Sequence, residues 1–275
     1  MLATLFDKLV GATLVVLNLL APVAVHVDTD RAYAPGNEHQ ADIYRPNGSG
    51  PSPVLVFLYG GGWRSGSKED VAYVGAAFAR RGFVVVIPEY RHFPTASLSD
   101  ILADNAAAVA WAIGHASEFG GDPHRVVVAG HSSGAWAAAM LGLDATWLER
   151  AGSSPEDLAG IVGLAGPYAT SALTDPLDKQ VFTGADPAMQ PINHAAAGRH
   201  PALLLLSGAE DQDVRPTGTI ALADRLQASE EPPQTHIYPG LGHGQIVRSL
   251  SFPFSVQATT AEDIARFAAG AHTGP

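Results

Sequence analysis

Residues 126–140 constrain the fold of this chain more than any other stretch. A run of three valines and an alanine leads into Gly-His-Ser-Ser-Gly at positions 130–134, and an alanine-rich run follows. This order predicts a buried strand, a sharp corner at Ser132 and a helix. The two flanking glycines allow the backbone to pass closely around the corner. A serine placed there raises its hydroxyl above a helix N-terminus, where it can attack a carbonyl group.

Composition excludes several classes of protein. The 275 residues are 47% hydrophobic and 16% charged, which is typical of a globular chain and not of a disordered one. The formal charge of −11 and the lack of a basic stripe argue against a nucleic-acid partner. The chain contains no cysteine, so disulfides, thiolate catalysis and cysteine-bound metals are excluded.

Strand and helix patterns alternate along the chain. Strands are expected at 25–33, 40–44, 54–59, 83–88, 126–129, 161–165, 202–207 and 236–238. Helices are expected at 68–81, 99–119, 135–143, 218–227 and 260–269. The first two strands are expected to pair antiparallel, and the others predict a mainly parallel central sheet with helices on both faces. With no repeat or linker in view, residues 25–275 are predicted to form a single catalytic domain of the α/β class.

A serine nucleophile needs a base, and the base needs a group that orients it. Such groups lie on loops that follow the carboxyl ends of strands in open α/β sheets. His243 is the predicted base, because the glycine-rich stretch 238–244 follows the last strand directly. His131 adjoins Ser132, but the corner turns neighbouring side chains apart, so His131 is expected to pack beside the strand.

The acid that orients the base is expected after the strand at 202–207, which is the last strand but one. Three carboxylates follow that strand, namely Glu210, Asp211 and Asp213. Asp211 is preferred because it lies three residues past the glycine that ends the strand, and the other two stay open. The order serine, aspartate, histidine along the chain is the one expected for this architecture.

Hydrolysis also needs backbone N–H groups aimed at the developing oxyanion. The N–H of Ser133 is the first candidate, because it opens the helix after the nucleophile. The second donor is expected in the loop Tyr59–Trp63, where three consecutive glycines let the backbone approach a substrate oxygen. Gly61 and Gly62 are the two candidates, and the sequence does not choose between them.

Together these segments resemble the serine α/β-hydrolase superfamily, and most closely small bacterial carboxylesterases near its hormone-sensitive-lipase and kynurenine-formamidase branches. The segments that carry the likeness are 59–63, 84–91, 121–134, 208–216 and 238–243. The resemblance implies an α/β-hydrolase fold and the triad of Ser132, Asp211 and His243. Two positions depart from the lipase-like pattern: Tyr59 occupies the position of a histidine, and Glu89 occupies the position of an aspartate. Both departures are expected to alter the support of the glycine loop and the acyl pocket.

The expected reaction is cleavage of a small-molecule carboxylic ester, with a short to medium acyl chain, through an acyl-enzyme. No metal and no organic cofactor is required. The alternative reaction is amide or formamide hydrolysis, including kynurenine formamidase activity. A further hypothesis, outside the enzymes, is a binding protein that has this fold but no catalytic activity. The pocket is expected to be mostly apolar, with walls drawn from Tyr59, Trp63, Phe93, Tyr168 and Phe182.

Two segments have no settled role. Residues 1–24 read as an N-terminal apolar helix or anchor, with contact to a membrane surface through residues 1–20. A cytoplasmic or membrane-associated location is favoured, with export through a signal segment as the alternative. Residues 166–200 form a long stretch rich in proline and aspartate, which is either a lid-like loop or a loop that crosses the sheet edge. The oligomeric state is not predicted.

Overall fold

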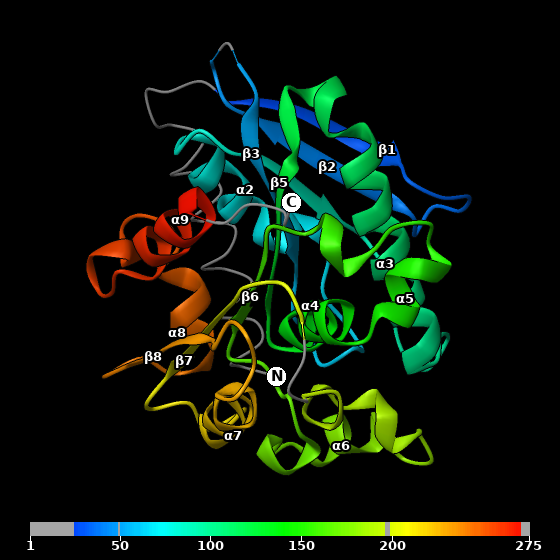
Figure 1. The fold of residues 1–275 in the computed structure, drawn as a ribbon, viewed down its shortest axis with the longest axis vertical. Coiled ribbons are helices and arrows are strands. Elements are labelled where there is room, and N and C mark those ends of the chain that lie inside the picture. Colours follow the sequence, from blue (N-terminus) through cyan, green and yellow to red (C-terminus); the bar gives the residue numbers. More distant parts are fainter. Residues whose placement is uncertain (1–24, 49, 196–198, 271–275) are drawn as a thin grey trace.

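The computed structural model describes residues 25–48, 50–195 and 199–270. Its centre is an eight-stranded sheet with the order β1-β2-β4-β3-β5-β6-β7-β8 (Figure 1). The strands are β1 (His26–Ala32), β2 (Gln40–Arg45), β3 (Ser52–Leu58), β4 (Val84–Pro88), β5 (Gly121–His131), β6 (Gly160–Leu164), β7 (Leu203–Gly208) and β8 (Gln234–Tyr238). Strand β2 pairs antiparallel with β1 and β4, and all other pairs are parallel. The expected mainly parallel sheet with an antiparallel start is confirmed.

Helices cover both faces of this sheet. They are α2 (Ala72–Ala79), α3 (Leu98–His115), α4 (Ser133–Leu143), α5 (Ala145–Arg150), α6 (Pro176–Val181), α7 (Thr217–Leu226), α8 (His243–Arg248) and α9 (Thr260–Gly270). In Figure 1, α3 and α5 lie on one side of the sheet and α2 and α9 on the other. The sequence did not predict α5, α6 and α8, because each has only six residues and shows no helical period.

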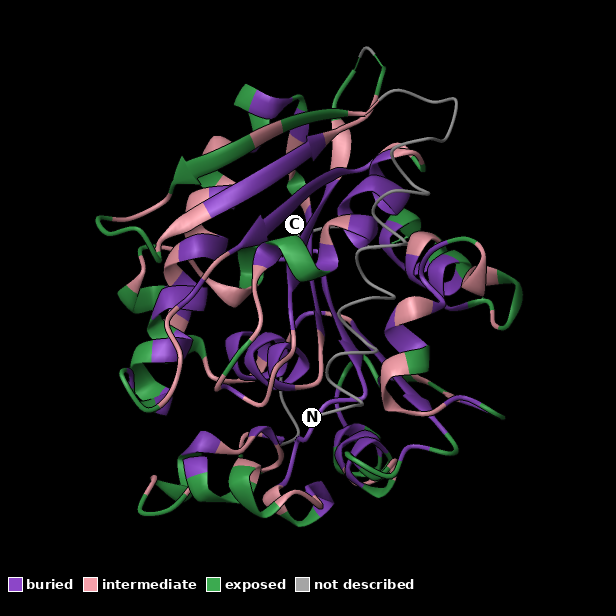
Figure 2. Cartoon of the chain, turned by 180° about the vertical axis from the view of Figure 1, so that it is seen from behind, coloured by how far each residue is buried: buried purple, intermediate pink, exposed green. Residues whose placement is uncertain are grey.

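The strands in the middle of the sheet carry the core. Residues 126–129 of β5 are fully buried, as their unbroken apolar run predicts, whereas most of β1 at the sheet edge is exposed (Figure 2). Strand β5 is flanked by β3 and β6, so it lies near the centre of the sheet. A loop that leaves the carboxyl end of β5 therefore rests on a rigid base.

The described part of the segment 166–200, residues 166–195 and 199–200, contains more secondary structure than its composition suggested. It contains α6 and several short 3-10 helices, and it is attached to the body of the protein. The indole N–H of Trp136 on α4 donates to the carbonyl oxygen of Met189 at 2.8 Å, and Val181 and Met189 are buried. Helix α6 lies near the lower end of the molecule in Figure 1.

Several expectations concern the N-terminal segment. Residues 1–24 lie outside the described residues, so the helix, anchor and membrane contact expected there stay predictions. The division into that segment and one catalytic domain stays a prediction as well. Within the described part of the chain, every helix is too short or too polar to span a bilayer.

Candidate active site

The backbone turns sharply at Ser132, between the end of β5 at His131 and the start of α4 at Ser133. Ser132 has φ 55° and ψ −122°, a backbone conformation that residues other than glycine rarely adopt. The turn is tight because a Cβ on Gly130 would overlap the carbonyl oxygen of Gly134. A Cβ on Gly134 would in turn overlap the carbonyl oxygens at the end of β3. Both flanking glycines are therefore required by close backbone contacts.

Three side chains that are far apart in the sequence meet above this corner. The Nε2 atom of His243 lies 2.9 Å from Oγ of Ser132, and its Nδ1 atom lies 2.7 Å from Oδ2 of Asp211. Asp211 follows β7, and His243 begins α8 just after β8. The side chains thus form one continuous hydrogen-bonded chain from a hydroxyl through an imidazole to a carboxylate.

The structure distinguishes the three carboxylates that follow β7. Asp211 is only 2% exposed, and its second oxygen accepts hydrogen bonds from the N–H groups of Asp213 (3.0 Å) and Val214 (2.9 Å). Glu210 and Asp213 are exposed, and neither carboxylate contacts His243. The geometry thus places Asp211 in the position predicted for the acid, and the catalytic role of that position remains a prediction.

His131 packs against the candidate base, a contact that the sequence did not predict. Its Nε2–H donates to the carbonyl oxygen of His243 at 3.0 Å, and the two rings are 4.8 Å apart. Burial, together with the nearby His243, lowers the pKa of His131 to about 3. His131 is therefore neutral at ordinary pH, and it holds the backbone of His243 in place.

The glycine loop after β3 lies against the serine corner. A Cβ on Gly60 would come within 2.9 Å of the Cβ of Ser132, so only glycine allows this approach. Gly61 (φ 147°) and Gly62 (φ 62°) adopt positive φ values and line the cavity beside Ser132. Among the hydrogen bonds of the described residues, none uses the N–H of Gly61, Gly62 or Ser133. These N–H groups are the ones predicted to bind the oxyanion.

The two departures from the lipase-like pattern contact each other. The hydroxyl of Tyr59 donates to the carboxylate of Glu89, which also accepts the N–H of Lys68 at 3.1 Å. The ring of Tyr59 stacks on Tyr90 at 4.3 Å, and the Tyr90 hydroxyl donates to the carbonyl oxygen of Tyr59 at 2.7 Å. Burial raises the pKa of both Tyr59 and Glu89. The two residues that depart from the lipase-like pattern, Tyr59 and Glu89, are therefore hydrogen-bonded to each other, and this contact supports the start of the glycine loop.

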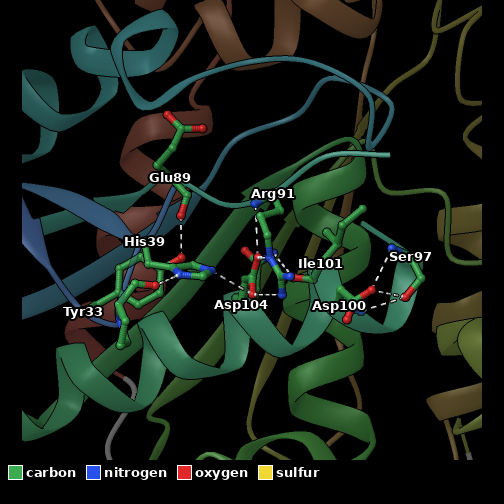
Figure 3. A network of polar contacts seen from close by, with 10 residues as sticks. Tyr33, His39, Glu89, Arg91, Ser97, Asp100, Ile101 and Asp104 are labelled. Carbon is green, nitrogen blue, oxygen red and sulfur yellow. Dashed lines mark hydrogen bonds and ion pairs between the residues drawn. The ribbon is translucent and has the colours of Figure 1, made fainter. Parts of the chain in front are cut away.

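A second network fixes the end of β4 (Figure 3). The guanidinium of Arg91 makes two hydrogen bonds to the carboxylate of Asp104 on α3, at 2.8 and 2.7 Å. His39 lies 3.1 Å from the same carboxylate, and the hydroxyl of Tyr33 donates to the carbonyl oxygen of Glu89 at 2.6 Å. The strand end that carries Glu89 is thus held from two sides.

A cavity of about 380 Å³ opens in front of Ser132. It is lined by the glycine loop, His243 and a set of charged side chains: Arg64, Asp70, Asp175, Asp178, Asp213 and Arg248. The expectation of a mostly apolar pocket holds only in part, because Val71, Tyr73, Val214 and Val247 line the cavity beside these charged side chains. The five aromatic residues proposed for its walls are absent from the lining, and three of them, Tyr59, Trp63 and Tyr168, are buried in the core. These charged residues could not be predicted as a group from the sequence, because they come from separate segments.

The described residues contain no cluster of three or more metal-binding side chains. The hydrogen-bonded chain from Ser132 to Asp211 can activate a hydroxyl by proton transfer alone.

A family comparison decides the classification. The BD-FAE family model matches residues 41–226, which is more than half of the chain. The chain belongs to the BD-FAE family. This match covers the glycine loop and the serine corner.

Curated relatives of this BD-FAE protein are esterases by name. The chain is 28% identical over 234 residues to isoprenylcysteine alpha-carbonyl methylesterase ICME of Arabidopsis thaliana, a match that covers 77% of this chain and 55% of the relative. It is 28% identical over 219 residues to esterase LipC of Mycobacterium tuberculosis, covering 70% of this chain and 53% of LipC. The chain therefore spans about half the length of the curated relatives it matches.

Solved structures with the same fold are also esterases. A tributyrin-phosphonate-inhibited esterase B from Lactobacillus rhamnosis superposes with a TM-score of 0.80 at 20% identity, covering 97% of this chain and 93% of that chain. A truncated carbohydrate esterase from gut microbiota gives a TM-score of 0.77 at 20% identity, covering 90% and 97%. At this identity the likeness establishes the fold, and the predicted α/β-hydrolase fold is confirmed.

Proposed function

We propose that this protein is a serine hydrolase that cleaves carboxylic esters through an acyl-enzyme. The observation that carries the proposal is the hydrogen-bonded chain from Ser132 through His243 to Asp211, next to three N–H groups that donate to no acceptor among the described residues. The esterase names of its relatives support the same reaction class. The triad and the N–H groups together supply the nucleophile, base and oxyanion donors that acyl transfer requires.

Acylation begins when the Oγ atom of Ser132 attacks the ester carbonyl. His243 accepts the hydroxyl proton through Nε2, and Asp211 keeps the proton on Nδ1 and stabilises the imidazolium cation. The N–H of Ser133, with that of Gly61 or Gly62, binds the oxyanion of the tetrahedral intermediate. The intermediate collapses as His243 gives its proton to the departing alcohol, which leaves an acyl group on Ser132.

Deacylation repeats these steps with water. His243 takes a proton from a water molecule, which attacks the acyl carbonyl and forms a second tetrahedral intermediate. The proton then returns to Oγ of Ser132, and the carboxylic acid leaves. Each step needs only the side chains and amides already described.

The cavity favours small substrates. Its volume of about 380 Å³ is at the lower end of the range for small-molecule sites. Charged side chains share its lining with apolar ones, so a long hydrocarbon chain would contact charged groups as well. We therefore propose a small ester with a short to medium acyl chain as the substrate. We also propose residues 25–275 as one catalytic domain, on the basis of the continuous sheet.

The test is hydrolysis of a series of p-nitrophenyl esters from acetate to palmitate, with N-formylkynurenine assayed beside them. We expect the highest kcat/KM for the short esters and a loss of activity in Ser132→Ala. Turnover of formylkynurenine alone would favour the formamidase alternative. Wild-type activity no greater than that of Ser132→Ala would favour a binding protein without catalysis.

A further inference from the structure

Helix α6 is joined to the end of the glycine loop by an ion pair whose residues line the cavity. The Nη2 atom of Arg64 lies 2.7 Å from Oδ1 of Asp178, and Nε lies 3.3 Å from the same oxygen. Asp175, at the start of α6, lies 3.5 Å from Nη2 of Arg64. The side chains of Arg64 and Asp178 are 33% and 20% exposed, so solvent screens this pair only in part.

The carboxylate of this pair touches the loop that we assign to the oxyanion. An oxygen of Asp178 occupies the space where a Cβ of Gly62 would lie. A negative charge at this place repels the negative charge that develops on the substrate oxygen during attack by Ser132. Arg64 adds a positive charge at hydrogen-bond distance from that carboxylate and offsets its charge, while the second carboxylate on Arg64, that of Asp175, lies farther away at 3.5 Å.

Helix α6 is also held by apolar contacts that do not involve the pair. The ring of Phe182, next to the end of α6, packs edge-to-face against Trp63 at 5.0 Å. Trp63 packs in the same way against Trp136 of α4, at 5.6 Å. Because these rings connect α6, the glycine loop and α4, removal of the charges leaves α6 attached.

We propose that Arg64 is a positioning residue that neutralises and orients Asp178 beside the oxyanion site. Arg64 holds the Asp178 carboxylate toward its own guanidinium, so the charge of Asp178 does not oppose the transition state. The inference rests on the proposed ester hydrolysis. It predicts a lower kcat when Arg64 alone is replaced than when Arg64 and Asp178 are replaced together.

The experiment is a double-mutant cycle with Arg64→Gln, Asp178→Asn and the combined variant, assayed with p-nitrophenyl butyrate. We expect Arg64→Gln to lower kcat about tenfold, and the combined variant to return to within about threefold of wild type. Arg64→Lys keeps the charge and is expected to stay within about threefold as well. High salt is expected to reduce the deficit of Arg64→Gln, since salt screens a partly exposed charge.

The matched control is Arg45→Gln, which breaks the ion pair of Arg45 with Asp28 between β1 and β2. That pair has the same 2.7 Å distance and similar exposure, and it lies outside the cavity lining. Arg45→Gln is expected to leave kcat unchanged. Thermal unfolding of every variant shows whether it is folded.

Three results would overturn the inference. The combined variant could be as slow as Arg64→Gln, all variants could match wild type, or the loss in Arg64→Gln could be independent of salt and unrelieved in Arg64→Lys. A wild-type enzyme no more active than Ser132→Ala would instead overturn the proposed function on which the inference rests.

Discussion

The two sides of Ser132 are built in different ways. On one side lie the loops after β7 and β8, which bring Asp211 and His243 together across 32 positions of sequence. On the other side, the glycine loop meets α6 through Arg64 and Asp178, which are 114 positions apart. The first side is buried around one carboxylate, and the second is charged and partly exposed. Both sides are assembled by long-range contacts, since Ser132 and His243 are themselves 111 positions apart. They differ in that each triad residue lies in a recognisable local motif, whereas Asp178 does not.

The largest effect should separate the buried acid from its exposed neighbour. Asp211→Asn is expected to lower kcat by about 10⁴, because the amide can no longer orient and stabilise the imidazolium. Asp213→Asn is the matched control and is expected to cost about threefold or less, since its carboxylate does not contact His243. The measurement is kcat on p-nitrophenyl butyrate. Comparable losses at both positions would contradict the assignment of the acid.

A second prediction concerns the charged wall. Four carboxylates and two arginines line the cavity, and the whole chain has a formal charge of −11. A p-nitrophenyl hemisuccinate is therefore expected to have a kcat/KM about tenfold below that of the uncharged butyrate ester. Raising the ionic strength should narrow the gap. Equal rates for both esters at low salt would show that the wall does not select by charge.

These two sides also differ in how far the sequence predicted them. The serine corner and the order of the triad could be predicted because each depends on a strand end followed by glycine or a polar loop within a few residues. The cavity wall could not, because Arg64, Asp178 and Arg248 belong to separate segments and line one cavity only after folding. The five aromatic residues were expected to line the cavity because aromatic side chains are common in binding pockets. An aromatic side chain can equally belong to the core, as Trp63 and Tyr168 do here.

A smaller effect is expected at the support of the glycine loop. Tyr59→Phe removes the hydroxyl that donates to Glu89 and keeps the ring that stacks on Tyr90. We expect a loss of about 1 kcal/mol in stability and a loss of about threefold in kcat, since a buried carboxyl then lacks one donor. Urea unfolding and steady-state kinetics measure the two effects. A change in stability without any change in kcat would show that the contact supports the fold but not the loop.

The last prediction concerns the pH dependence of stability. His131 has a folded pKa of about 3, lowered by burial from an ordinary value of 6.5, so the unfolded chain binds a proton more readily than the folded chain. His131 therefore does not change the free energy of unfolding above pH 6.5. Below that pH, its protonation in the unfolded chain lowers the free energy of unfolding by about 1 kcal/mol per pH unit as the pH drops toward 3. His131→Gln should show a shallower fall than wild type.

The matched control for that measurement is His124→Gln, an exposed histidine on the same strand β5. Urea unfolding at several values between neutral and mildly acidic pH gives the slope for each variant. Identical slopes for His131→Gln and wild type would show that His131 is protonated as easily in the folded protein as in the unfolded one.

The backbone angles at Ser132 have a consequence for how this protein can be improved. A non-glycine residue in such a conformation carries a cost on the order of 1–3 kcal/mol, which the surrounding packing sustains. Glycine at this position would relieve that cost and remove the hydroxyl. Selection for heat resistance alone would therefore reward loss of the reaction, and any library screened for a sturdier protein has to be screened for turnover in the same step.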